Sequence, residues 1–243
     1  RLTADLNMTG YPWTTFTTIG DTSPGFTLDG DGHIVSNLVI TSSWEYSSGG
    51  SGHARRVGMF YKTGSFPVTF KDIVFEDPVL SSNGAANTIG SECFMALLVS
   101  YAHEGTSALT FERVGIVNGK LTMTSGGSAS STQMNGLFLG RVTHGTVYFK
   151  NCFATGTIKS SASGWKMQAG GLAGSSGTAG MTTLEECYVD VAFINPTGGA
   201  AIFGNPSEPV IEGLSFFNSA RHPYYTGGEL THDHVVPCSA SEM

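Results

Sequence analysis

A short pattern of apolar residues recurs along the chain. In the segment that begins at Phe70, the first, fourth and sixth positions are apolar: Phe70, Ile73 and Phe75. The same spacing gives six copies, whose first residues are Val35, Phe70, Phe111, Phe149, Leu184 and Ile211. Successive copies begin 35, 41, 38, 35 and 27 residues apart. Self-similarity at such intervals is typical of a solenoid or other repeat array.

The segments between these copies predict strands and turns rather than helices. Short apolar runs alternate with stretches rich in serine and glycine, at 42–52, 81–91, 124–133, 159–164 and 195–200. Runs of this length bounded by Gly, Asn, Ser and Thr are typical of strands, and no run has helical periodicity. The sequence therefore predicts an all-β fold, a parallel β-helix in which each repeat forms one coil and its neighbours complete the core.

The position within a copy predicts where each side chain lies. The first, fourth and sixth residues face inward, and equivalent residues stack about 4.8 Å apart in successive coils. The third position lies at a bend, where small polar residues or glycine fit unusual dihedral angles. Arg113 fits this position poorly; the set is Asn37, Asp72, Arg113, Asn151, Glu186 and Gly213.

Several segments resemble secreted proteins that carry GLUG-motif repeats. The resemblance is most specific in the first forty residues, in Leu2-Thr-Ala-Asp-Leu-Asn-Met-Thr-Gly-Tyr-Pro-Trp13 and in the segment Phe26–Ile40. The repeat itself resembles Val57-Gly-Met-Phe60, Asn135-Gly-Leu-Phe-Leu-Gly140 and Ala169-Gly-Gly-Leu-Ala-Gly174. The resemblance covers about residues 2–218. It implies the right-handed β-helix of microbial surface adhesins and fibre proteins, and it brings no catalytic motif.

Length and composition agree with one elongated extracellular domain. Of the 243 residues, we expect 1–25 to form an N-terminal coil or cap with Tyr11, Trp13 and Phe16 at its end, and 26–218 to complete six to seven coils. Residues 219–243 leave the repeat and form a C-terminal extension. Because Arg1 already lies in an apparent strand, we expect a processed form or a piece of a longer protein. Charged residues are 13% of the chain and the net charge is −7, which disfavours nucleic acid as a partner. No apolar stretch is long enough for membrane insertion.

Two outward columns follow from the same repeat. The second positions are Ser36, Lys71, Glu112, Lys150, Glu185 and Glu212. Lys71, Glu112 and Lys150 alternate in sign, so stacked neighbours attract each other, and we expect this column to control strand register. The fifth positions are unexpectedly apolar and predict either a lateral interface or a surface covered by a loop or the tail: Val39, Val74, Gly115, Phe153, Tyr188 and Ser215.

Cysteines and polar motifs supply the remaining candidates. Cys152 and Cys187 share one inward position in successive coils, and we favour a buried thiol stack over a disulfide because the parallel spacing is too wide. Cys93 and Cys238 lie outside the repeat, and their pairing stays open. The segment Asp29–His33 could bind calcium or supply catalytic carboxylates, although a tight turn is the favoured interpretation.

Two segments outside the repeat frame are candidates for binding. Trp44 and Tyr46 could contact carbohydrate, or their loop could fold against the barrel. In the tail, His232 and His234 have metal-ligand chemistry without a fixed fourth ligand, and we favour ordinary polar histidines. We expect no cofactor. The apolar tail residues that could dock on a neighbouring subunit are Tyr224, Tyr225, Val235 and Val236.

These observations predict a non-enzymatic, secreted structural or adhesive protein. We expect a surface fibre or filament subunit that assembles with copies of itself, or with other extracellular proteins, through its solenoid ends and tail. Glycans are a possible further partner. The alternative is a β-helix protein that binds or cleaves polysaccharide, for which Glu185, Glu186 and Glu212 come nearest to a carboxylate cluster.

Overall fold

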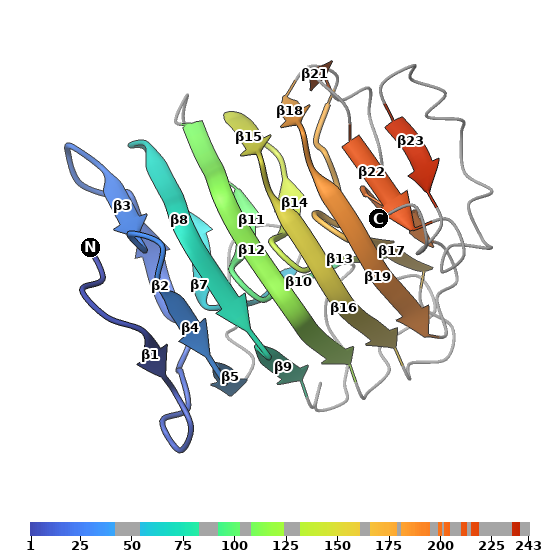
Figure 1. Cartoon of the computed structure of the whole chain (residues 1–243). Helices are drawn as coiled ribbons and strands as arrows, with labels where there is room; N and C mark the ends of the chain where they lie inside the picture. Colours follow the sequence, from blue (N-terminus) through green and yellow to red (C-terminus); the bar gives the residue numbers. More distant parts are fainter. Residues whose placement is uncertain are drawn as a thin grey trace.

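The chain folds as an all-β solenoid of parallel sheets (Figure 1). The computed structural model describes residues 1–41, 54–82, 92–102, 108–123, 132–160, 166–178, 181–194, 199–200, 202–204, 210–212, 215–218 and 235–238. None of these residues lies in a helix. The fold class predicted from the repeat is therefore confirmed at the level of a parallel β-solenoid.

Among the described residues, three sheets form the walls. The smallest has the order β14-β11-β7-β2 and contains β2 (Phe16–Ile19), β7 (Phe60–Thr63), β11 (Val99–Ala102) and β14 (Leu139–Val142). The second has the order β20-β17-β13-β10-β6 and contains β6 (Ala54–Val57), β10 (Glu92–Ala96), β13 (Thr132–Gly136), β17 (Lys166–Gly170) and β20 (Gly199–Ala200).

The largest sheet, the main sheet, is the broad face seen in Figure 1. Its central path runs β1-β4-β8-β12-β16-β19-β22-β23, and a second row of strands pairs alongside in the order β3-β8-β12-β15-β18-β21. Its strands are β1 (Leu6–Asn7), β3 (Phe26–Asp29), β4 (Ile34–Ser36), β5 (Val39–Thr41), β8 (Val68–Glu76), β9 (Val79–Ser82), β12 (Ala108–Met123), β15 (Thr146–Lys150), β16 (Phe153–Ser160), β18 (Thr182–Glu185), β19 (Tyr188–Ile194), β21 (Val210–Glu212), β22 (Ser215–Asn218) and β23 (Val235–Cys238).

The predicted stacking of equivalent residues is confirmed. Phe70 pairs with Phe111, and Phe111 with Phe149, in direct parallel register. Their ring centroids lie 5.2 and 5.1 Å apart with interplanar angles of 23° and 11°, so the three rings form one stack inside the solenoid. All three side chains are fully buried. Leu184 and then Ile211 continue the same file of residues.

The frame of the first predicted copy is wrong. Val35 pairs with Phe75, and the residue that pairs with Phe70 is Leu28. The reason is that the main sheet bends twice in this part of the chain, and both bends have similar spacing. Phe75 and Leu80 flank the second bend just as Phe70 and Phe75 flank the first, so apolar spacing alone cannot assign Val35 to one of them.

The bends themselves were predicted correctly. Asp72, Arg113, Asn151 and Glu186 all have positive φ, between 49° and 53°, and form the first column of bends. Asn37 also has positive φ (57°), but it belongs to a second column. That column continues with Asp77 (51°) and Asn118 (53°). Gly213 lies outside the described residues.

Glycines are required where the second sheet turns into the smallest. A Cβ atom on Gly136 would lie 2.4 Å from the carbonyl oxygen of Leu139 and 2.6 Å from the Cα of Ala173. One coil later, a Cβ on Gly170 would lie 2.1 Å from the carbonyl oxygen of Ala173. Glycine is therefore required at the first position of Gly136-Leu-Phe and of Gly170-Gly-Leu, because backbones approach closely at this corner.

Candidate functional site

One end of the solenoid core is open to solvent. A hollow of about 590 Å³ opens between β2 and β3, and its aromatic lining residues are Trp13, Phe16, Phe26 and Phe60. Phe16 is 56% exposed, an unusual state for an apolar side chain this close to a core. The sequence predicted that Trp13 and Phe16 lie at an end surface, but it missed Phe26 and Phe60, which come from later strands.

The hollow adjoins the end of the aromatic stack, where Leu28 pairs with Phe70 and Phe26 pairs with Val68. Phe26 lies 6.1 Å from Phe70 and 5.5 Å from Phe60, centroid to centroid, and Phe60 in turn lies 5.7 Å from Phe70. Trp13 packs edge-on against Phe60 at 6.1 Å, and its indole N–H donates to the carbonyl oxygen of Met59 at 2.9 Å. In the interior each ring has a neighbour on both sides along the coil axis. At this end, among the described residues, no strand pairs with the outer side of β2 or β3, and apolar surface such as that of Phe16 is exposed.

Strand edges lie at this end of the solenoid, and those of β2 and β3 border the hollow. Within the described residues, β2 is the last strand of its sheet, and β1 and β3 are the last strands on this side of the main sheet (Figure 1). Such edges present backbone N–H and C=O groups that can pair with another strand. Leu6 and Tyr11, which are 45% and 72% exposed, extend the apolar surface nearby. This end therefore combines the two features that favour addition of further β-structure, open hydrogen bonds and open apolar surface.

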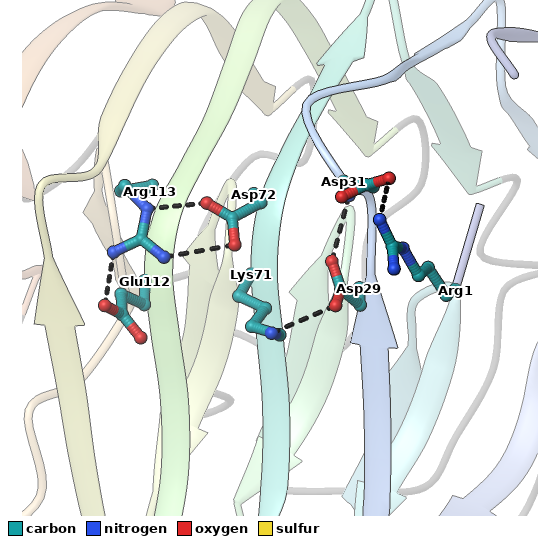
Figure 2. Close-up of polar contacts among 7 residues, drawn as sticks. All are labelled: Arg1, Asp29, Asp31, Lys71, Asp72, Glu112 and Arg113. Atoms are coloured by element: carbon teal, nitrogen blue, oxygen red, sulfur yellow. Dashed lines mark hydrogen bonds and ion pairs between the residues drawn. The ribbon is translucent and has the colours of Figure 1, made fainter. Parts of the chain in front are cut away.

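Charged side chains form a row across the outer face of the main sheet (Figure 2). Lys71 lies 2.9 Å from Asp29, and the Arg113 guanidinium donates to both carboxylate oxygens of Asp72, at 2.5 and 3.0 Å. Arg113 also pairs with Glu112. Arg113 can therefore occupy a bend position that suits small residues better, because its side chain joins two neighbouring strands by ion pairs.

Ion pairing shifts the acids of this row toward their charged forms. The hydrogen bond from Arg113 lowers the pKa of Asp72, and the hydrogen bond from Lys71 lowers the pKa of Asp29. These carboxylates are paired, and each pair joins neighbouring strands of the parallel ladder. The arrangement fits the predicted control of strand register.

The second-position column lies in register from Lys71 onward, in the order Lys71, Glu112, Lys150, Glu185 and Glu212. Ser36 was placed in this column wrongly, because it pairs with Glu76, and the residue that pairs with Lys71 is Asp29. Lys150 lies 3.0 Å from Glu185. Glu185 and Glu212 are adjacent in the ladder, but Glu185 is already paired with Lys150. Lys71 and Glu112 instead pair with Asp29 and Arg113.

The segment Asp29–His33 forms a tight turn. The backbone N–H of Asp31 donates to Oδ1 of Asp29 at 2.9 Å, and Asp31 and Gly32 both have positive φ. Asp31 is also paired with Arg1, and His33 lies 3.1 Å from Asp5. In the part of the chain that the structure describes, no three His, Cys, Asp or Glu residues group in a way that could hold a metal ion.

The predicted apolar stripe is only partly one column. Val74, Gly115, Phe153 and Tyr188 do pair in succession. Val39 was placed in this column wrongly, because it pairs with Val79 beyond the second bend, and Ile34 pairs with Val74 instead. At the other end Phe216, not Ser215, pairs with Tyr188.

The Phe153 ring occupies the space above Gly115, where a Cβ would lie 2.2 Å from the ring. The role of Val74, Phe153 and Tyr188 in an interface stays a prediction.

Cys152 and Cys187 are free, buried thiols. The Cys152 Sγ lies 3.3 Å from the carbonyl oxygens of both Phe111 and Lys150, and its single proton can be donated to either. Burial raises the pKa of Cys187 well above its ordinary value, so this thiol stays protonated in the folded protein.

The remaining candidates lie outside the described residues or are described only by their backbone. Val235 and Val236 belong to β23, where they pair with Ser215 and Phe216. The candidates outside the described residues are Trp44, Tyr46, Tyr224, Tyr225, His232 and His234.

Comparisons of this chain with protein-family models, with curated proteins and with solved structures gave no match. A separate search of the described residues for a helix long and apolar enough to cross a membrane found none. The resemblance to GLUG-repeat proteins therefore stays an expectation from the sequence. The open solenoid end, described above by its aromatic hollow and its unpaired edges, is the candidate site that the geometry supports best.

Proposed function

We propose that the protein is a non-enzymatic extracellular structural or adhesive subunit that assembles through the end of its solenoid. The observation that carries this proposal is the aromatic hollow at the open end, where Phe16 is exposed and lines the hollow with Trp13, Phe26 and Phe60. A second copy stacked on this end would cover the hollow and pair the edges of β1, β2 and β3. Contacts between unlike ends generate an open filament whenever the rotation does not close.

We further propose six to seven coils wound in a right-handed sense. The six copies of the apolar pattern in the sequence, together with the N-terminal segment that precedes them, support the count. The resemblance to GLUG-repeat proteins supports the handedness and the extracellular location. The low content of charged residues, 13%, is also in keeping with an extracellular β-solenoid.

The experiment is sedimentation velocity over a hundredfold range of protein concentration, combined with electron microscopy. Wild-type protein should form elongated oligomers as concentration rises, and Phe16→Asp should stay monomeric because a carboxylate would have to be buried in the apolar contact. Tyr148→Asp is the matched control, since Tyr148 is also exposed (40%) but lies on β15, away from the open end. Removal of residues 221–243 tests the contribution of the tail. Wild-type protein that remains monomeric at every concentration would refute the proposal.

A further inference from the structure

A polar hollow lies on the outer face of the main sheet, away from the open end and from the row of ion pairs. Its volume is about 350 Å³. The residues that line it are Asp77, Asn118, Lys120, Thr155, Gly156, Thr157 and Asp190. This volume lies at the lower end of the range for small-molecule sites in proteins.

The hollow lies where β16 has one residue fewer than β12. Two residues, Val117 and Asn118, separate Ile116 from Gly119 in β12. In β16 only Thr155 separates Ala154 from Gly156, the partners of Ile116 and Gly119. The second column of bends, which includes Asp77 and Asn118, therefore stops at β16. The bends form one wall of the hollow, and β16 forms its floor.

Gly156, one of the lining residues, packs closely against the backbone of β12. Its φ is +146°, and a Cβ atom here would lie 2.0 Å from the carbonyl oxygen of Gly119. No other residue fits without moving the backbone of β12. On the same floor, Thr155 Oγ1 accepts a hydrogen bond from the backbone N–H of Asn118 at 2.9 Å. The hydroxyl proton of Thr155 is not used in that bond, and a hydroxyl group can donate while it accepts.

The charges and donors of the lining indicate a neutral ligand rich in hydroxyl groups. The Asp77 and Asp190 carboxylates accept hydrogen bonds, the Lys120 ammonium donates them, and the hydroxyls of Thr155 and Thr157 do both. Two carboxylates against one ammonium group disfavour an anion, in a protein whose net charge is −7. The ammonium group in turn disfavours a metal cation.

An aromatic surface adjoins the hollow on the same face. Phe153 precedes Thr155 by two residues on β16, and Tyr188 precedes Asp190 by two residues on β19. Side chains two apart on a strand share a face, at about 6.6 Å from each other. Phe153 and Tyr188 are themselves neighbours in the ladder. A ligand here would thus meet hydrogen-bonding groups at one point and aromatic carbon at the next, a combination typical of ligand sites.

We propose that this hollow, together with Phe153 and Tyr188, binds a neutral oligosaccharide that lies along β16. One sugar unit occupies the polar hollow, and an adjoining unit rests on the aromatic pair. The site is separate from the open end and does not depend on assembly of the solenoid.

Isothermal titration calorimetry with three neutral hexasaccharides (cellohexaose, xylohexaose and mannohexaose) tests this proposal on the full chain. Hexagalacturonate and calcium chloride are titrated separately as charged comparators. Wild-type protein should bind at least one neutral hexasaccharide with a Kd below about 1 mM. Asp190→Ala and Thr157→Val should each weaken that binding, the former by about tenfold because it removes a charge-assisted hydrogen bond. Thr110→Val, a substitution on β12 in the outward Thr69–Tyr148 column, should bind like wild type.

The outcomes separate this proposal from its alternatives. Circular dichroism confirms that each variant is folded before it is titrated. The proposal is overturned if no neutral hexasaccharide binds, if Asp190→Ala and Thr157→Val bind as well as Thr110→Val, or if calcium or hexagalacturonate binds in place of the neutral sugars. Phe16→Asp should retain the sugar affinity of wild type, so failure of the assembly proposal leaves this test intact.

Discussion

Replacement of Phe111 by alanine tests the aromatic stack on which the fold depends. Phe111 is fully buried, and its ring lies 5.2 Å from Phe70, 5.1 Å from Phe149 and 5.3 Å, edge-on, from Phe138. Loss of a buried phenylalanine costs about 3–5 kcal/mol. Because neighbours on both sides and one on the facing wall hold the site open, the cavity cannot collapse easily. We expect a loss near the upper end of that range.

The measurement is urea unfolding followed by far-ultraviolet circular dichroism, with Phe16→Ala as the control. Phe16 is 56% exposed, so its replacement should cost less than about 1 kcal/mol. Solenoids can unfold coil by coil, so amide hydrogen exchange should accompany the urea curves. It should show the loss of protection centred on β8, β12 and β15. A loss below about 1 kcal/mol for Phe111→Ala, or one equal to that of Phe16→Ala, would refute the stack as the main source of stability.

Three further predictions concern the corner, the ion pairs and the thiols. Gly136→Ala should destabilise the fold by about 1–3 kcal/mol in the same urea assay, because its Cβ would lie 2.4 Å from a carbonyl oxygen; an unchanged midpoint would contradict the close approach. Arg113 lowers the pKa of Asp72, so their pair stabilises the folded state above the unfolded pKa of about 3.9 and this contribution is lost as pH falls below it. Asp72→Asn should therefore show a smaller loss of stability between pH 5 and pH 2 than wild type, and parallel curves would contradict this. Cys152 and Cys187 should not react with Ellman's reagent in native buffer when the other two cysteines are replaced by serine, and should both react in urea; rapid native labelling would exclude burial.

The inward positions of the fold were predictable because they obey a strict rule. Each inward residue is covered by equivalents above and below, so apolar identity recurs at fixed rank, as at Phe70, Phe111 and Phe149. The bends were also predictable. Asp72 and Asn151 have positive φ, a conformation that short polar residues tolerate.

The frame of the first coil and most of the candidate site could not be predicted. Val35 fits either bend of the main sheet by spacing, and only the hydrogen-bonded register assigns it to Phe75. The open end combines Phe16 with Phe60, which lies more than forty residues later and has the same apolar signature as any core position. Whether the residues at this end are exposed depends on which coil is the outermost. The order of coils is a property of the whole solenoid and cannot be read from local sequence.

The polar hollow illustrates how a solenoid can gain a site without loss of its core. A one-residue difference between β12 and β16 would normally shift every later side chain to the opposite face. Here Gly119 and Gly156 absorb it at one point, so that Ile116 pairs with Ala154 before the irregularity and Leu121 with Ile158 after it, with all four side chains still buried. The inward side chains therefore stay stacked, while the outer surface has the polar hollow at this point. Since bulges of this kind redirect side chains at small cost to the ladder, departures from the repeat are where a binding site on this fold should be sought.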